Sequence, residues 1–125
     1  MVPGDTLNLE TCTIRMRFRQ KDLEHAVRLL LSVRGSIRDK RGCRACEVGM
    51  EAAEAGLVHY REEWEPGEDF LRHVRSEEFR RVLIALDMCC EEPRVVVGSL
   101  SGRAGMSHLL KLREIAWAPI ATDGA

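Results

Sequence analysis

The stretch Glu62–Leu83, EEWEPGEDFLRHVRSEEFRRVL, contains the transition on which the fold depends. Its first residues complete an alternating segment that ends at Trp64, Pro66-Gly67 interrupts that segment, and the residues beyond repeat at helical spacing. Proline cannot donate a hydrogen bond to a sheet and suits the first turn of a helix. Ser76, followed by two glutamates, is typical of an N-cap. The stretch therefore predicts a strand, a corner and two consecutive helices.

The segments around this stretch supply the other predicted elements. Residues 11–19 alternate strictly between apolar and polar side chains, which is typical of a strand with one face on the core. Residues 21–42 carry apolar side chains at three- and four-residue steps, the pattern of an amphipathic helix, in which Gly35 favours a kink or an early end. Further strands are predicted at 43–51, 57–64 and from Arg94. The order β-α-β-β-α-β predicts an α+β, ferredoxin-like antiparallel sheet with both helices on one face.

Length and charge limit the class of protein. A chain of 125 residues suits one domain. We expect an N-terminal extension at 1–10, the domain at 11–101, and a tail at 102–125 that forms a short helix from Ser107 and is then disordered. The net charge is −1 with acids and bases interspersed, and no apolar run approaches the roughly 20 residues of a membrane span. We therefore expect a cytoplasmic protein without a nucleic-acid or membrane partner.

Five cysteines without a secretory leader predict free thiols in a reducing compartment. Cys43 and Cys46 form a CxxC, which by itself is weak evidence for zinc or redox chemistry. If the segment is a strand, residues three apart point to opposite faces and cannot share one metal ion. We interpret both thiols as structural and predict no metal site.

The face of the sheet away from the helices is predicted to be partly apolar. By period-two counting, Leu57, Val95 and Val97 can point to it. A sheet with a second semi-apolar face needs a partner, and a two-fold homodimer that buries sheet against sheet is the simplest one.

Glu62 and His73 are the candidate catalytic residues. Glu62 shares the predicted buried face with Tyr60 and Trp64, where a carboxylate must find hydrogen-bond donors or become a tuned acid or base. His73 lies beside the apolar stripe of the following helix, within reach of the same corner, and a histidine–carboxylate pair can move protons near neutral pH. The same pair also satisfies a half-buried imidazole, so a structural role remains an alternative.

Trp64 and Tyr60 are the candidate substrate-binding residues, because their rings can stack on a planar ligand; aromatic side chains on a core face are also often simply core. The sequence has no P-loop, no Gly-rich dinucleotide motif after a strand and no HExxH motif. We therefore predict no cofactor.

Together these residues resemble the antibiotic biosynthesis monooxygenase (ABM) family. The resemblance rests on the E-x-W of Glu62-Glu63-Trp64, on His73 nine residues after Trp64, and on Gly42-Cys43 at the start of the second strand. Phe70, Ser76 and Phe79 extend the pattern, and the similarity covers roughly residues 11–101.

The resemblance implies a dimeric α/β barrel in which two ferredoxin-like sheets face each other. Some members are cofactor-independent oxygenases of quinols or aromatic polyketides, in which the substrate supplies the electrons for oxygen. Haem-degrading members carry tryptophan where this chain has His73 and an iron-binding histidine where it has Leu83, so that branch fits poorly. We expect a quinol or phenol monooxygenase that binds a small aromatic or quinone-like ligand; the alternative is a non-catalytic ligand-binding or stress-response module.

Overall fold

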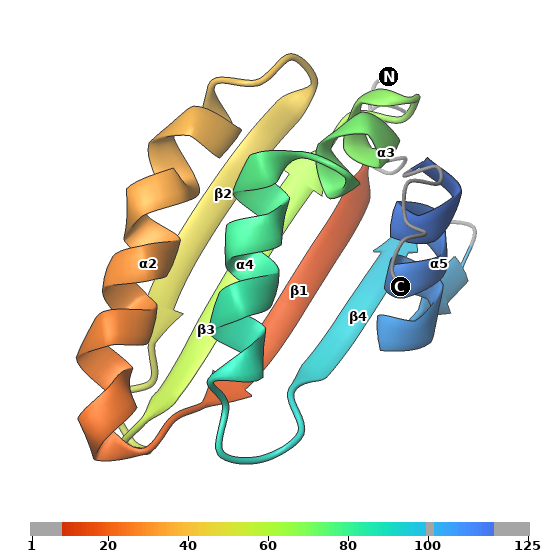
Figure 1. Ribbon diagram of the computed structural model, residues 1–125. Coiled ribbons are helices and arrows are strands. Elements are labelled where there is room, and N and C mark those ends of the chain that lie inside the picture. Colours follow the sequence, from red (N-terminus) through yellow and green to blue (C-terminus); the bar gives the residue numbers. More distant parts are fainter. Residues whose placement is uncertain (1–8, 100–101, 117–125) are drawn as a thin grey trace, which may run out of the picture.

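The computed structural model describes residues 9–99 and 102–116. These residues form five strands and four helices (Figure 1). In chain order the elements are β1 (Glu10–Arg17), α2 (Gln20–Arg38), β2 (Cys43–Met50), β3 (Leu57–Trp64), α3 (Asp69–Val74), α4 (Glu77–Asp87), β4 (Arg94–Ser99), β5 (Gly102–Ala104) and α5 (Met106–Ala116).

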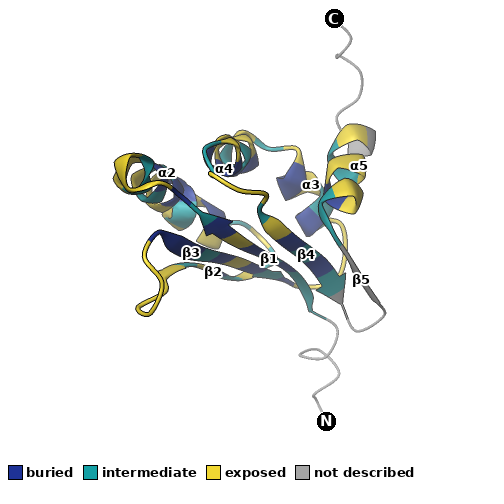
Figure 2. Ribbon diagram, turned by 90° about the horizontal axis from the view of Figure 1, so that it is seen from below, coloured by how far each residue is buried: buried dark blue, intermediate teal, exposed yellow. Residues whose placement is uncertain are grey.

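The strands make one antiparallel sheet in the order β2-β3-β1-β4-β5. Its first four strands have the order of a ferredoxin-like sheet, so the predicted fold is confirmed. Figure 2 shows the helices on one side of the sheet and the other side without a helical layer. The sequence indicated the corner correctly: β3 ends at Trp64, α3 follows, and the Ser76 hydroxyl caps α4 by accepting the Phe79 N–H at 3.2 Å.

The register of β4 corrects one expectation. Val95 pairs with Ile14 and Val97 with Cys12, so both valines share the helix-covered inner face and are buried there. Leu57 does lie on the outer face, opposite Arg17, but it is only 4% exposed within the single chain. The expected place of Leu57 is therefore right, whereas that of Val95 and Val97 is wrong.

Charged and polar side chains occupy most of the outer face instead. Arg61 pairs with Glu63 and with Glu47, and Arg15 stands opposite Arg94 across the β1–β4 ladder. Alternation explains this composition, because every second residue of each strand points away from the helices. A homodimer through this face must match charges rather than bury a hydrophobic patch.

A β-bulge at the start of β2 corrects the interpretation of the CxxC. The register places Cys43 opposite Trp64, shifts between Cys43 and Ala45, and then places Cys46 opposite Glu62. A bulge sets two residues against one on the partner strand, so the period-two count gains one residue. Cys43 and Cys46 consequently share the inner face, and the prediction of opposite faces is wrong.

The turn after α2 fixes α3 against the sheet. The helix runs through Gly35 without a break and ends at Arg38. Gly42 then adopts φ +86°, and a Cβ there would lie 2.5 Å from the Asp69 carboxylate. Only glycine suits both this conformation and this close approach. The contact places the turn before β2 beside the start of α3, which brings two parts of the candidate site together.

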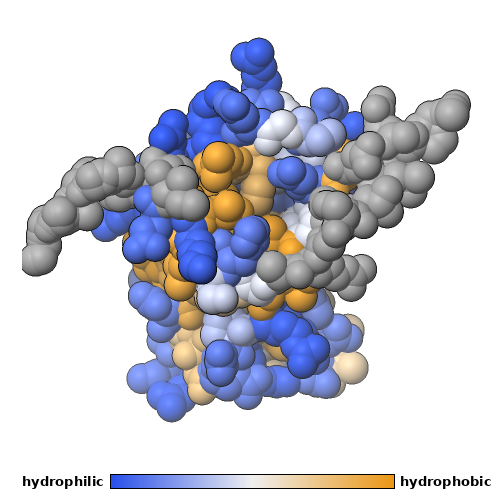
Figure 3. Space-filling view, turned by 90° about the vertical axis from the view of Figure 1, so that its right-hand side faces the viewer, coloured by the Kyte–Doolittle hydropathy of each residue, from blue (hydrophilic) through white to orange (hydrophobic). Residues whose placement is uncertain are grey.

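Residues 102–116 continue the same sheet and its helical layer. The helix expected from Ser107 begins at Met106, whereas the short strand β5 was not predicted. In α5, Leu109 is buried, Leu110 is exposed, and the Arg113 guanidinium donates to the Val74 carbonyl at 2.6 Å. Figure 3 shows this side of the molecule, where hydrophobic groups gather in patches on a mostly hydrophilic surface.

The disorder expected at the end of the tail falls on residues 117–125, outside the described residues. None of the described helices is both long enough and apolar enough to cross a lipid bilayer.

Candidate functional site

Glu62 is the centre of a buried polar cluster on the inner face of β3. Its side chain is fully enclosed and accepts three hydrogen bonds. The Trp64 indole N–H donates to Oε1 at 2.9 Å, and the Tyr60 hydroxyl and His73 Nε2 both contact Oε2, the histidine at 3.0 Å. Alternation puts Tyr60, Glu62 and Trp64 on one face, and α3 brings the histidine over them. The carboxylate is therefore held by donors alone, the arrangement that suits its ionised form.

The side chain of His73 is buried as completely as that of Glu62. Its ring stacks on Trp64 with centroids 4.7 Å apart and meets the edge of Phe79 at 5.3 Å. The side chain has no exposed surface. These contacts fix the plane of the imidazole, so each ring nitrogen has one defined environment.

The hydrogen bonds of His73 define its tautomer. Nδ1 lies 3.1 Å from the Lys40 ammonium, which can only donate, so Nδ1 must be the acceptor. The ring proton is then on Nε2, where it is donated to Glu62. The Ser76 hydroxyl lies 3.4 Å from the same Nδ1. The structure thus contains a neutral imidazole oriented by a carboxylate, with its basic nitrogen on the side of Lys40 and Ser76.

Lys40 connects this buried pair to the surface. Its ammonium also forms a 3.0 Å ion pair with Glu78, and this hydrogen bond lowers the pKa of the Glu78 carboxyl. Lys40 and Glu78 are each about one-third exposed or less, at 26% and 33% of their side chains. A continuous chain of polar contacts therefore runs from Glu78 through Lys40 and His73 to Glu62.

The far side of Glu62 is closed by groups that stay protonated. Cys46 donates to the Tyr60 hydroxyl at 3.4 Å. Burial, followed by the nearby Glu62 charge, raises the pKa of Tyr60 well above its usual value. Burial is also the main reason why the pKa of Cys46 rises to about 12. Cys12, on the opposite neighbouring strand, has its pKa raised by the same two causes. These groups surround one negative charge without adding another.

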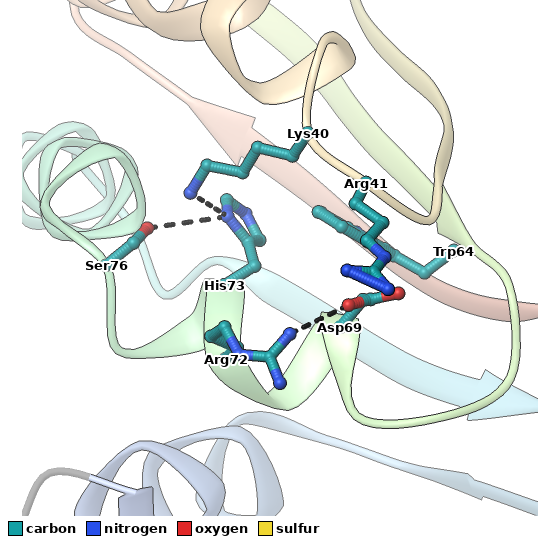
Figure 4. Close-up of a pocket in the computed structure, with 7 residues that line it drawn as sticks. All are labelled: Lys40, Arg41, Trp64, Asp69, Arg72, His73 and Ser76. Atoms are coloured by element: carbon teal, nitrogen blue, oxygen red, sulfur yellow. Dashed lines mark hydrogen bonds and ion pairs between the residues drawn. The ribbon is translucent and has the colours of Figure 1, made fainter.

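A pocket of about 250 Å³ opens on the Nδ1 side of His73 (Figure 4). It is lined by Lys40, Arg41, Trp64, Asp69, Arg72, His73 and Ser76. Lys40 and Arg41 reach in from the turn after α2, and Arg72 from α3. Both hydrogen-bond partners of Nδ1 belong to the lining, so this nitrogen is the polar atom of the buried pair nearest to a ligand in the pocket.

The structure brings all four predicted site residues together but does not give them equal access. His73 and Trp64 line the pocket, whereas Glu62 and Tyr60 lie behind them and do not. Their assignment as catalytic or substrate-binding residues stays a prediction.

Sequence reasoning missed the cations of the pocket, Lys40, Arg41 and Arg72. Basic residues at the end of a helix are usually explained by its dipole, which conceals any other role. The position of Lys40 and Arg41 could have indicated their role. They come immediately before Gly42-Cys43, where β2 begins, and Cys43 pairs with Trp64 in the candidate site.

Within residues 9–99 and 102–116, no group of three or more histidine, cysteine, aspartate or glutamate side chains is arranged to hold a metal ion. The same part of the chain has no buried side-chain nitrogen or oxygen without a hydrogen-bond partner. The cluster around Glu62 is thus complete in the single chain.

Comparison with known proteins assigns the chain to a family. The model of the antibiotic biosynthesis monooxygenase (ABM) family matches residues 11–83, which include β1 through most of α4. The protein belongs to the ABM family, whose members form dimeric α/β barrels. No curated protein matches the chain.

Solved structures with low sequence identity share the fold. A conserved protein from Methanosarcina mazei is 14% identical with a TM-score of 0.71, over 78% of this chain and 98% of that one. Rv0793 from Mycobacterium tuberculosis is 19% identical with a TM-score of 0.62, over 73% and 93%. A crystal structure of an antibiotic biosynthesis monooxygenase is 17% identical with a TM-score of 0.62, over 72% and 96%. At these identities the likeness concerns the fold alone.

Proposed function

We propose that the protein is a cofactor-independent monooxygenase of the ABM family that oxidises a quinol or phenol in the pocket beside His73. The observation that carries the proposal is the buried Glu62–His73 pair, whose unprotonated ring nitrogen lies on the pocket side, where it accepts from Lys40. A carboxylate that fixes the tautomer of a histidine and stabilises its cation is a recurrent device for proton abstraction.

His73 acts as the base in this proposal. Nδ1 accepts the proton of the substrate hydroxyl once Lys40 leaves its present position, and Nε2–H stays bonded to Glu62. The buried carboxylate then stabilises the imidazolium that forms, because opposite charges attract strongly away from water. Glu62 is a positioning residue, since it touches the histidine and not the substrate. Trp64 forms the wall of the pocket, and Tyr60 supports Glu62 from behind.

The oxidation itself balances without a bound cofactor. A benzoquinol and O₂ give a hydroxybenzoquinone and water, so one oxygen atom enters the substrate and the other leaves as water. Both electron pairs come from the quinol, and its deprotonation makes it the stronger reductant. The protein supplies the proton acceptor and a pocket beside it that holds the ring.

The assembly and location belong to the same proposal. We place the protein in the cytoplasm as a homodimer through the outer face of the sheet, supported by membership of a family of dimeric barrels. The charged composition of that face means that arginines such as Arg15 and Arg94 must meet acids of the second copy or water.

Oxygen uptake with a panel of reduced benzoquinones between pH 6 and 9 tests the activity. We expect turnover above the protein-free rate that falls at least about a hundredfold in His73→Asn, which keeps a polar side chain but removes the base. The matched control is His59→Asn, because His59 pairs with Glu51 on the other face of β3. Uptake equal to the protein-free rate at every pH would refute the enzyme.

One observation favours a second candidate, a non-catalytic module that binds a small aromatic ligand. Every polar atom of Glu62 is satisfied within the chain, which suits a structural anchor as well as a positioning residue. In that case aromatic ligands raise the melting temperature but no oxygen is consumed, and His73→Asn lowers stability without changing ligand affinity per folded molecule.

A further inference from the structure

The pocket beside His73 contains more cationic groups than its proposed reaction needs. Lys40, Arg41 and Arg72 line it, and Asp69 is the only carboxylate among the lining residues. A neutral quinol requires one proton acceptor and a wall for its ring, and it gains little from three positive charges. The surplus points to a ligand that carries a negative charge of its own.

The three cations are not equally available. Arg72 is held by Asp69 at 2.8 Å and also approaches Glu68. The Lys40 ammonium contacts both the Glu78 carboxylate, at 3.0 Å, and His73 Nδ1, at 3.1 Å. The exposed side chain of Arg41 has no hydrogen bond or ion pair to any residue that the structure describes. Arg41 is therefore the cation that can bind an incoming anion without first losing a partner.

Lys40 can respond to the same anion. It occupies the basic nitrogen of His73 as a donor, so that nitrogen is blocked while Lys40 stays where it is. A ligand anion competes for the ammonium, because a carboxylate is a much stronger acceptor than a neutral imidazole. The backbone around Lys40 is held by hydrogen bonds from Lys40 to the Ile37 carbonyl and from Cys43 to the Lys40 carbonyl, so the movement is confined to the side chain.

Size and walls restrict the rest of the ligand. A volume of about 250 Å³ is just below the usual range of small-molecule sites, about 300–1,000 Å³, and suits a single ring. The stacked Trp64 and His73 rings border the pocket, and aromatic ligands pack well against such groups. Guanidinium groups also favour the faces of aromatic rings and bind carboxylates through two hydrogen bonds.

We propose that the pocket selects a single-ring aromatic acid, whose carboxylate binds Arg41 and draws Lys40 away from His73 Nδ1. The catalytic part of this inference rests on the proposed function. The negative charge of the correct substrate would draw Lys40 away and so expose His73, the base that deprotonates the substrate hydroxyl. Arg41 would then determine specificity, and Lys40 would keep the histidine blocked until an acid is bound.

Binding of benzoate and benzamide to the intact protein tests the recognition, since the two molecules have nearly the same shape and differ in charge. We expect calorimetry to show benzoate bound at least about tenfold more tightly, which corresponds to about 1.4 kcal/mol. Arg41→Gln should remove most of this preference. Arg44→Gln is the matched control, because Arg44 lies three residues further on, pairs with Glu65 and does not line the pocket. Equal affinity of the wild type for benzoate and benzamide would overturn the proposal. So would an equal loss of the benzoate preference in Arg41→Gln and Arg44→Gln.

Nitrogen-15 NMR of the His73 ring tests the release by Lys40. Benzoate should change the Nδ1 resonance of wild type as the lysine leaves, whereas Lys40→Met should show the released resonance without ligand and change little when benzoate is added. An Nδ1 resonance that is unaffected by saturating benzoate would exclude the release.

Oxygen uptake separates this inference from the proposed function. Faster uptake with 2,5-dihydroxybenzoate than with 2,5-dihydroxybenzamide supports both. If benzoate binds preferentially but no oxygen is consumed, the proposed oxygenase activity is refuted and the proposed binding site for an aromatic acid stands. Uptake at equal rates with both substrates, and equal affinity for both benzoyl ligands, refutes the acid site and leaves the oxygenase.

Discussion

Glu62 owes its stability to the chemical kind of its three partners, all of which donate. In Glu62→Gln one oxygen becomes an NH₂ group, which then faces the donors of Tyr60 and His73. Moving the His73 proton to Nδ1 would cost the hydrogen bond that Lys40 donates there. We expect a loss of about 2–4 kcal/mol in the free energy of unfolding, the usual cost of a broken buried polar cluster.

Urea denaturation monitored by tryptophan fluorescence measures this loss. Glu47→Gln is the control, since its side chain is 61% exposed and its ion pair with Arg61 is long at 3.7 Å; it should change stability by less than about 0.5 kcal/mol. A Glu62→Gln protein as stable as this control would contradict the account of the cluster.

The five thiols should differ sharply in reactivity. Burial raises the pKa of Cys43 to about 11 and that of Cys46 to about 12, so at pH 8 almost none of either exists as the reactive thiolate. Cys90 is the exposed thiol. Labelling of the native protein with a chromogenic disulfide at pH 8 should show one fast thiol that disappears in Cys90→Ser, and all five thiols after denaturation. Fast labelling of Cys46 at pH 8 would show that the inner face is open.

At the scale of elements, the sequence predicted most of what positions the site. The E-x-W alternation and the Pro66-Gly67 break were sufficient to place Glu62 and His73 at one corner. The bulge at the start of β2 was not predictable, because it depends on pairing with β3 and leaves no mark in a period-two count. The pocket was missed for a related reason: its cations come from two segments, the turn after α2 and α3, that only the tertiary fold brings together, through the close approach of Gly42 to Asp69 and the contact of Lys40 with His73.

Gly42 and Gly35 should respond in opposite directions to alanine. Gly42→Ala places a Cβ 2.5 Å from the Asp69 carboxylate at a positive φ, so we expect a loss of about 1–3 kcal/mol and a disturbed α3. Gly35→Ala adds a methyl group to an exposed helix position with nothing within 4 Å, and should stabilise the protein by about 0.5–1 kcal/mol.

Thermal denaturation of both variants checks these signs. A Gly42→Ala protein with the melting temperature of wild type would mean that the turn before β2 does not hold α3 in place.

At the scale of the whole molecule, the proposed homodimer forms through the outer face of the sheet. Light scattering at micromolar concentration should give twice the chain mass of 14.1 kDa. Arg15→Glu reverses a charge in the middle of this face, opposite Arg94, and should weaken the dimer because a mismatched charge in an interface is costly. Arg28→Glu, on exposed α2, should leave it intact. A wild-type mass of 14.1 kDa would refute the dimer.

The central claim is that His73 deprotonates a quinol or phenol so that its electrons pass to oxygen. Turnover under ¹⁸O₂, followed by mass spectrometry of the product, tests it most directly. We predict one ¹⁸O atom in each product molecule with wild type, and incorporation in His73→Asn no faster than in buffer. Incorporation by wild type that does not exceed the rate in buffer, with either the carboxylated or the neutral substrate, would contradict the claim.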